Sequence, residues 1–131
     1  MITDPVIQFT WAVTNWANTI APDREAKDAV VKMVEETSEL LDAVLNKDRD
    51  AVEEELGDCM ILLADIADMY GIDLISAGYR KMAVNAKRTW TNNNGVIRRE
   101  RGDGTDRQTS DGAGEAVSDQ SYEPGTVGSG A

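Results

Sequence analysis

The sequence contains no histidine, and this absence excludes several kinds of active site. Serine or cysteine nucleophiles activated by an imidazole, zinc bound by histidine and imidazole acid–base catalysis all require that side chain. The one cysteine, Cys59, has no partner for an internal disulfide, as is typical of proteins in a reducing compartment. Any catalytic chemistry in this chain must therefore rest on carboxylates and cations.

The sequence also lacks long apolar runs. The longest, residues 59–64, is far shorter than the roughly 20 residues that cross a bilayer. Residues 1–5 do not have the basic start of a signal peptide. We therefore expect a cytoplasmic protein that has no membrane as a partner.

Basic residues are few, because 13 lysines and arginines stand against 24 acidic residues and the net charge is −11. This balance argues against a nucleic-acid partner, since a broad basic surface normally neutralises the phosphates of bound nucleic acid. An acidic domain that handles a phosphate compound would instead need bridging cations. The composition thus gives a first indication of metal dependence.

Helical periodicity extends over most of the chain, whose 131 residues suffice for one domain. Apolar spacing, prolines and capping residues predict an all-α, four-helix bundle over residues 1–100, with helices at about 5–20, 23–45, 48–70 and 74–90. The third of these is apolar nearly all round from Cys59 onward, which predicts a central, buried helix. Residues 96–97 fit a brief extended segment, but no alternation is long enough to build a sheet.

Residues 101–131 differ in composition from the rest of the chain. They are rich in glycine, serine, aspartate and threonine and contain almost no large apolar side chain. Such a segment cannot bury enough surface to offset the entropy of ordering. The sequence therefore predicts a disordered acidic tail after the bundle.

Two acidic pairs lie on consecutive predicted helices. Glu36 and Glu39 share a helical face, as do Glu55 and Asp58 on the next helix, because residues three apart are neighbours on a helix. A short turn joins the two helices, which should pack antiparallel and let the four carboxylates converge. Oxygen ligands of this kind suit hard cations such as Mg²⁺ or Mn²⁺.

Spacing alone leaves the choice of ligands open. Glu35 with Glu39, and Glu54 with Asp58, are equally good neighbours four residues apart. A helical wheel places Glu36 at the edge of the apolar stripe and Glu35 towards solvent. The wheel therefore favours Glu36.

Acidic pairs at helical spacing also occur on ordinary solvated surfaces, as in a helical interaction module without enzymatic activity. We interpret a third pair, Asp65 and Asp68, as such a polar strip. Two repelling pairs on adjoining helices, however, favour a bound cation.

The two acidic segments carry a resemblance to a known family. Residues 34–40 (VEETSEL) and 54–58 (EELGD) resemble the EExxEL and EELGD signatures of MazG-like nucleoside triphosphate pyrophosphohydrolases, which are all-α enzymes. The resemblance implies two or more Mg²⁺ or Mn²⁺ ions, bound by Glu36, Glu39, Glu55 and Asp58. It also implies hydrolysis of (deoxy)nucleoside triphosphates to monophosphate and pyrophosphate, with Glu36 or Glu39 as the catalytic residue that helps deprotonate the attacking water.

A third segment extends the resemblance. Lys81, Asn85 and Arg88 lie on one face of the predicted fourth helix and resemble the family's KxxxNxxR segment, which implies contacts with the triphosphate. The alternative is a basic helix end that offsets the helix dipole. Residues 81–90 with Gly95 resemble the compact phage-encoded, MazZ-like branch, which implies the host cytoplasm and a purine deoxynucleotide, with dGTP favoured. A pyrimidine substrate, dUTP or dCTP, is the alternative.

The first predicted helix is the aromatic one. Trp16 offers a stacking face and Asn15 or Gln8 can hydrogen-bond a base edge, so we expect these three residues to bind the nucleobase. The alternative for the tryptophan is packing in the core or an interface. Because a bundle this small leaves its first and third helices partly uncovered, we also expect a homodimer or homotetramer.

Overall fold

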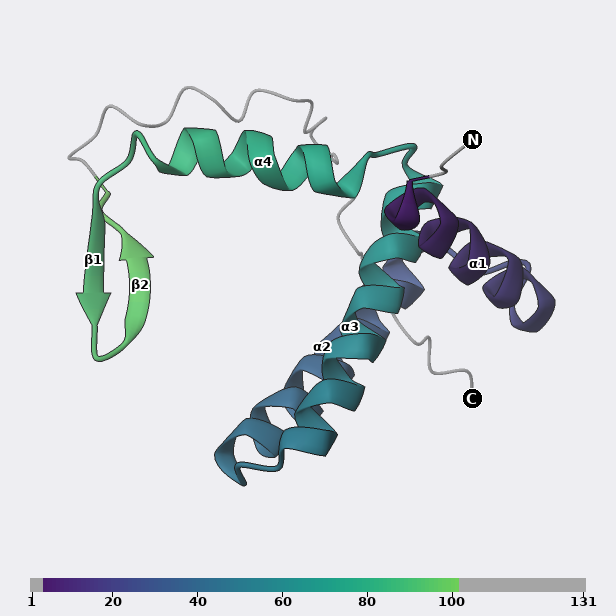
Figure 1. Cartoon of the computed structure of the whole chain (residues 1–131), viewed down its shortest axis with the longest axis horizontal. Coiled ribbons are helices and arrows are strands. Elements are labelled where there is room, and N and C mark those ends of the chain that lie inside the picture. The colour runs from purple at the N-terminus through teal and green to yellow at the C-terminus, as the bar shows by residue number, and fades with distance from the viewer. Residues whose placement is uncertain (1–3, 102–131) are drawn as a thin grey trace, which may run out of the picture. The chain divides into compact units, whose positions relative to one another are not determined.

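The computed structural model describes residues 4–101, which form four helices followed by one β-hairpin (Figure 1). In chain order the elements are α1 (Pro5–Ile20), α2 (Ala26–Leu45), α3 (Arg49–Met69), α4 (Leu74–Asn85), β1 (Trp90–Asn93) and β2 (Val96–Arg99). The predicted all-α class with four helices is confirmed, and the hairpin is an addition to it. The predicted disordered tail lies outside the described residues, except for Arg101.

Three of the helices begin at aspartates that the sequence marks as caps. The carboxylate of Asp4 accepts a hydrogen bond from the backbone N–H of Val6 at 2.8 Å. Asp48 does the same for α3, and Asp73 for α4. Side-chain oxygens at these positions satisfy backbone donors that the first helical turn leaves unpaired, which explains why the helices begin there.

The second helix begins a few residues later than predicted. Residues 22–23 form a turn, and α2 is capped by Glu25, whose backbone N–H donates to Asp28 at 2.9 Å. The Glu25 side chain accepts in return from the backbone of Asp28, so the two residues form a reciprocal capping box. The capping box provides acceptors for the backbone N–H groups at the start of α2. Asp23 does not cap the helix, because it lies in the turn before it.

The fourth helix ends at Asn85, before the predicted Trp90, and the prediction of no sheet is wrong. β1 and β2 pair antiparallel, with Trp90 opposite Arg99 and Asn93 opposite Val96. The connecting Asn94-Gly95 both have positive φ, at 50° and 88°. An Asn-Gly pair favours the two-residue hairpin turn. The strands of four residues are too short to show a clear alternation in the sequence.

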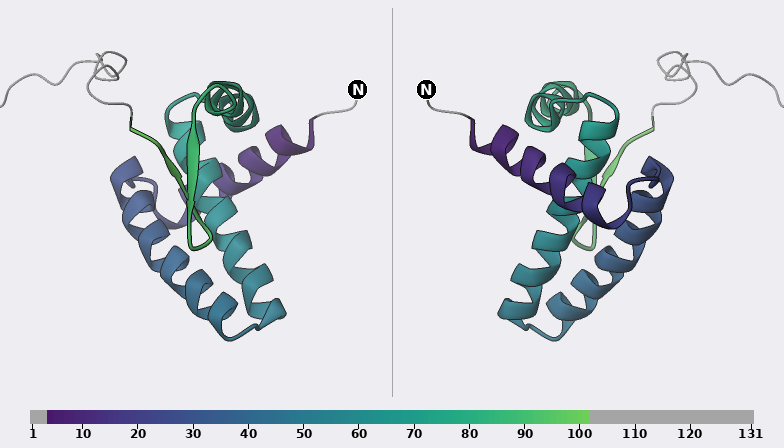
Figure 2. Two further views of the ribbon diagram at one scale, coloured as in Figure 1. Left: turned by 90° about the vertical axis from the view of Figure 1, so that its left-hand side faces the viewer. Right: turned by 90° about the vertical axis from the view of Figure 1, so that its right-hand side faces the viewer.

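Helix α3 holds the helical unit together. It lies side by side with α2, joined by a tight turn at residues 46–48, and it also contacts α1 and α4 (Figure 2). Small side chains occupy the closest contacts, because the buried apolar residues are Val13, Ala17, Ala29, Ala43, Ala64 and Ala67. The predicted central position of α3 is therefore correct.

The predicted burial of α3 is not reached within one chain. Leu63 in its apolar half is 42% exposed, and elsewhere Trp11 and Val34 are 71% and 66% exposed. Among the described residues no large side chain is fully buried. A single chain thus leaves most of its large apolar side chains at least partly in contact with solvent.

The chain divides into two compact units, of which the first ends at Arg88 and holds all four helices. The second begins at Thr89 and includes the hairpin. The division into residues 1–100 and 101–131 remains a prediction. Over residues 4–101, none of the helices combines the length and apolar character needed to span a membrane.

Candidate metal centre

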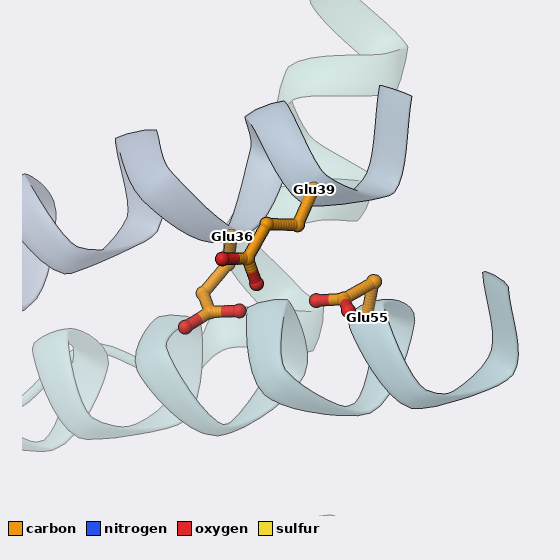
Figure 3. Close-up of side chains that lie close together, drawn as sticks. All are labelled: Glu36, Glu39 and Glu55. Carbon is orange, nitrogen blue, oxygen red and sulfur yellow. The ribbon is translucent and has the colours of Figure 1, made fainter. Parts of the chain in front are cut away.

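Three glutamates meet where α2 and α3 face each other. Glu36 and Glu39 extend from α2 and Glu55 from α3, and their side chains point toward one another (Figure 3). One carboxylate oxygen from each lies within 4.8 Å of the others. The antiparallel pairing of the two helices brings these acids together, although Glu55 follows Glu36 by nineteen residues. We call these three residues the carboxylate cluster.

Glu36 is the buried member of the cluster, with 5% of its surface exposed. Its Oε1 lies 2.7 Å from Nζ of Lys32, one turn earlier on α2. This hydrogen-bonded ion pair is the main cause that lowers the pKa of Glu36, and it outweighs the opposing effect of burial. Glu36 is therefore held in its ionised form, ready to bind a cation.

Glu55 is the member of the cluster whose carboxylate is least satisfied. Its Oε2 is buried and has no hydrogen-bond partner. Burial, followed by the proximity of Glu36, Glu39 and Asp58, raises the pKa of Glu55. A buried acceptor without a donor is costly, and adjacent like charges add to that cost. A divalent cation would relieve both, and an all-carboxylate donor set suits Mg²⁺ or Mn²⁺.

The fourth predicted ligand, Asp58, is not among the three oxygens that converge. It lies exposed on α3, where with Glu54 it lines a shallow depression that also includes Ile61. Its charge nevertheless contributes to raising the pKa of Glu55. The structure places Glu35 outside the cluster, in an exposed ion pair with Lys32 at 3.0 Å. The assignment of all four ligands remains a prediction.

The predicted phosphate-binding residues are only partly arranged as expected. Lys81 is exposed on α4, and Asn85 is the last residue of that helix. Arg88 lies beyond the helix end, so the predicted single helical face does not extend to it, but its Nη1 donates to Asn85 Oδ1 at 3.3 Å. In Figure 1, α4 extends away from the α2–α3 pair, which carries the carboxylate cluster.

The three predicted base-binding residues do not all lie at the same pocket. Trp16 lines an apolar pocket bounded by α1, the segment 21–24, α2 and α3. Gln8 and Asn15 are exposed and do not line it. Adjacent residues on a helix point about 100° apart, which turns Asn15 away from the pocket that Trp16 lines.

Three polar residues also line this pocket, and none of them was predicted to belong to a binding site. They are Arg24, Asp28 and Asp65. Asp65 is 5% exposed and ion-paired with Arg24, so its interpretation as part of a polar surface strip is wrong. An acid between Ala64 and Ile66 in an apolar stretch was the available signal, because a buried carboxylate requires a partner.

Comparisons with known proteins agree with this arrangement. Residues 25–89 match the family described as the MazG nucleotide pyrophosphohydrolase domain. A dATP/dGTP diphosphohydrolase of Salmonella phage PMBT28 is 38% identical over 78 residues, which are 60% of this chain but 25% of that protein. A dATP/dGTP diphosphohydrolase of Cyanophage S-2L is 32% identical over 94 residues, which are 71% of this chain and 86% of that protein. This chain thus spans about a quarter of the first relative and most of the second.

A solved structure extends the similarity to the fold. It is the Cyanophage S-2L MazG-like pyrophosphohydrolase bound to dGDP and three catalytic Mn²⁺ ions per active site. The two structures align with a TM-score of 0.63 and 29% sequence identity, over 76% of this chain and all of the other. The sequence motifs, the helical fold and these relatives lead to one conclusion: the chain belongs to the MazG nucleotide pyrophosphohydrolase family.

Proposed function

We propose that this protein hydrolyses deoxynucleoside triphosphates to monophosphates and pyrophosphate in a reaction that depends on Mg²⁺ or Mn²⁺. The observation that carries the proposal is the carboxylate cluster, in which the buried Glu55 Oε2 has no donor. Two further facts support it: the chain belongs to the MazG family, and its structural relative binds three Mn²⁺ ions. A helical interaction module would not need such a cluster.

The residues that would hold two or more ions are Glu36, Glu39, Glu55 and Asp58. Mg²⁺ or Mn²⁺ at this position would offset the charge of the substrate phosphates and make water a better nucleophile. Glu36 or Glu39 accepts the proton of the water that attacks the α-phosphorus, and pyrophosphate leaves. The ion pair with Lys32 suits Glu36 to stay ionised beforehand.

Lys81, Asn85 and Arg88 would stabilise the charge that develops on the phosphates. Because α4 extends away from the cluster in one chain, we propose that these residues approach the phosphates within an assembly of several copies. The exposed large apolar side chains on α1 to α4 support a homodimer or homotetramer as that assembly. The net negative charge of the chain does not suit a nucleic-acid partner.

We further propose a purine deoxynucleotide as the substrate, with dGTP favoured. Both phage relatives are dATP/dGTP diphosphohydrolases, and the solved relative holds dGDP. In this chain Trp16 stands at the apolar pocket and offers a stacking surface to a purine. Gln8 and Asn15 remain predicted base contacts, although the polar groups at the pocket itself are Arg24, Asp28 and Asp65.

The proposal is tested by incubating the protein separately with each common NTP and dNTP, with Mg²⁺ and with Mn²⁺. Release of pyrophosphate is measured apart from release of phosphate. We expect pyrophosphate and a monophosphate as the products, no turnover in EDTA, and dGTP as the best substrate. Release of inorganic phosphate, or metal-independent turnover, would contradict the reaction. Faster hydrolysis of dUTP or dCTP would contradict the proposed substrate alone.

A further inference from the structure

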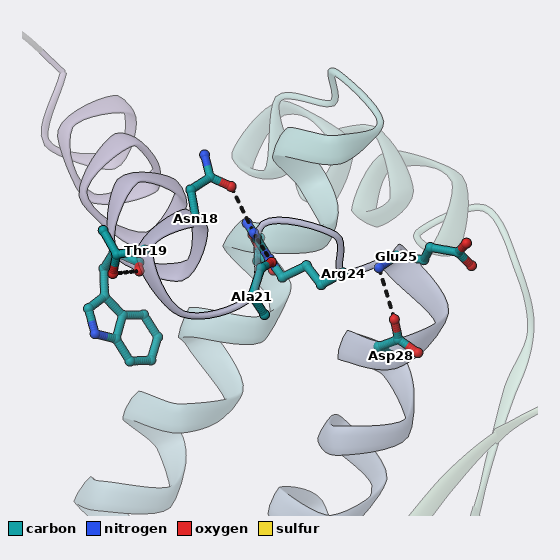
Figure 4. Close-up of polar contacts among 8 residues, drawn as sticks. Asn18, Thr19, Ala21, Arg24, Glu25 and Asp28 are labelled. Carbon is teal, nitrogen blue, oxygen red and sulfur yellow. Dashed lines mark hydrogen bonds and ion pairs between the residues drawn. The ribbon is translucent and has the colours of Figure 1, made fainter.

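A part-buried ion pair joins the end of α1 to the middle of the chain. Arg24 donates to Asp65 through two parallel hydrogen bonds, from Nε to Oδ2 at 2.8 Å and from Nη2 to Oδ1 at 2.6 Å. Its Nη1 donates to Asn18 Oδ1 at 2.8 Å and to the Ala21 carbonyl at 3.1 Å (Figure 4). One guanidinium therefore ties α1, the segment after it and α3 together.

This pair is unlike the other ion pairs of the described residues. Only 13% of the Arg24 side chain and 7% of the Asp65 side chain are exposed, whereas at least one partner of each other pair is mostly solvated. Both partners have their charges matched by hydrogen bonds, and the bond to Asp65 is the main cause that raises the pKa of Arg24. Burying charges costs desolvation energy, so such a pair is weak evidence for added stability. Its fixed fork geometry points instead to a role in holding elements in position.

Helix α1 packs on α3 with few fully buried side chains. Among the described residues of this helix only Val13 and Ala17 are buried, and both have small or medium side chains. Hydrogen bonds from Arg24 to Asn18 and Ala21 add a polar anchor at the C-terminal end of α1 and restrain the angle at which α1 lies on α3. Any change in that angle moves Trp16, two residues before Asn18.

The pair also lies at the pocket that Trp16 lines. Arg24 and Asp65 belong to its wall, together with Ile61 of α3. Ile61 also lines the depression beside Asp58, so the apolar pocket adjoins that depression on α3. Along α3, the pocket residues Ile61 and Asp65 follow Glu55 of the carboxylate cluster by roughly two to three helical turns.

We propose that Arg24 and Asp65 are positioning residues for the nucleoside half of the substrate. The pair fixes the wall formed by α1, including Trp16, at a set distance from the carboxylate cluster, so that a bound base places its phosphates at the metals. This inference rests on the proposed function. It assigns no chemical step to either residue, and it predicts that their loss weakens nucleotide binding more than it slows the reaction.

The test compares Arg24→Lys and Asp65→Asn with the unchanged protein in steady-state hydrolysis of dGTP with Mn²⁺. Arg24→Lys keeps the positive charge but loses the two parallel hydrogen bonds to Asp65. If the charge alone were needed, this variant would behave like the unchanged protein. Inorganic triphosphate, used as a competitive inhibitor, reports on the phosphate and metal half of the site without a base. Arg49→Lys is the matched control, because Arg49 forms an exposed ion pair with Glu53 of the same helix.

We expect the KM for dGTP to rise about tenfold in both variants, in the range that displaced pocket contacts produce, with kcat within about twofold. The inhibition constant of inorganic triphosphate and all values of the control should stay unchanged. An unchanged KM, an equal weakening of inorganic triphosphate, or a fall in kcat alone would overturn the inference. If Asp65→Asn fails to fold, Arg24→Lys decides the matter by the same values. Absence of turnover in the unchanged protein would instead contradict the proposed function.

Discussion

Replacing Glu55 by glutamine should make the metal-free protein more stable while removing its response to metal. The Glu55 Oε2 is buried without a donor and lies among Glu36, Glu39 and Asp58, so the free carboxylate is unfavourable where it stands. Glutamine has nearly the same shape and carries no charge. Its amide N–H groups can also donate hydrogen bonds to the neighbouring carboxylates. Removing the charge should therefore raise the Tm in EDTA. Because like charges about 4 Å apart interact only weakly in water, we expect this rise to be about 2–5 °C.

With manganese bound, the unchanged protein should have a higher Tm than Glu55→Gln. A ligand at about a hundred times its Kd raises the Tm of a domain of this size by roughly 10 °C or more. We expect that response in the unchanged protein and a small fraction of it in Glu55→Gln. Glu54→Gln is the matched control, because Glu54 is the adjacent acid on α3 and lies outside the cluster.

The pH dependence of the same measurement follows from the raised pKa of Glu55. When the pKa of a carboxyl is higher in the folded than in the unfolded chain, ionising it destabilises the folded protein. Stability is therefore lost as the pH rises from the ordinary pKa of the carboxyl through the raised pKa. In EDTA the advantage of Glu55→Gln over the unchanged protein should therefore be small near pH 4 and grow above the ordinary glutamate value of about 4.3. Thermal unfolding followed by circular dichroism gives both curves. A lower Tm for Glu55→Gln in EDTA would contradict an unfavourable free carboxylate at this position, and a full manganese response in the variant would contradict Glu55 as a metal ligand.

Three further predictions concern the tail, the assembly and the base. A chain that ends after Arg101 should keep its helical circular dichroism and most of its activity, and loss of soluble oligomer on truncation would contradict this. Light scattering should find a dimer or tetramer, and Val34→Glu, which charges a side chain that is 66% exposed, should reduce its mass towards that of one chain. In a mixture of equal dGTP, dATP, dCTP and dTTP the purines should be consumed first, and Trp16→Ala should weaken that selectivity; unchanged selectivity would place the base elsewhere.

The helices were predictable because local signals agreed with one another. Asp4, Asp48 and Asp73 were available as caps, and apolar spacing gave the helical faces between them. The hairpin was missed although Asn94-Gly95 signals one, because its two strands are too short to outweigh the helical pattern before them. Arg88 was consequently placed on a helix that ends three residues earlier.

The site was predictable only where both partners lie on helices with a known register. Helical geometry favoured Glu36 over Glu35, and the structure does place Glu36 toward α3. The contact of Arg24 with Asp65 joins residues 41 apart, and it depends on how α1 and its following turn lie on α3. No local spacing carries that information. Asp58 and the residues of α4 illustrate the same limit, since their distance from the cluster depends on packing rather than on periodicity.

We propose that the carboxylate cluster drives metal-dependent hydrolysis of a deoxynucleoside triphosphate. Glu36→Gln and Glu35→Gln form the most direct comparison, because these neighbours on α2 share an ion-pair partner, Lys32, but only Glu36 belongs to the cluster. Pyrophosphate release from dGTP with saturating Mn²⁺ should fall at least about a hundredfold in Glu36→Gln, as expected when a group needed for the chemical step is lost. It should stay within about twofold of the unchanged protein in Glu35→Gln. Equal activities in the two variants would contradict a catalytic role of the carboxylate cluster.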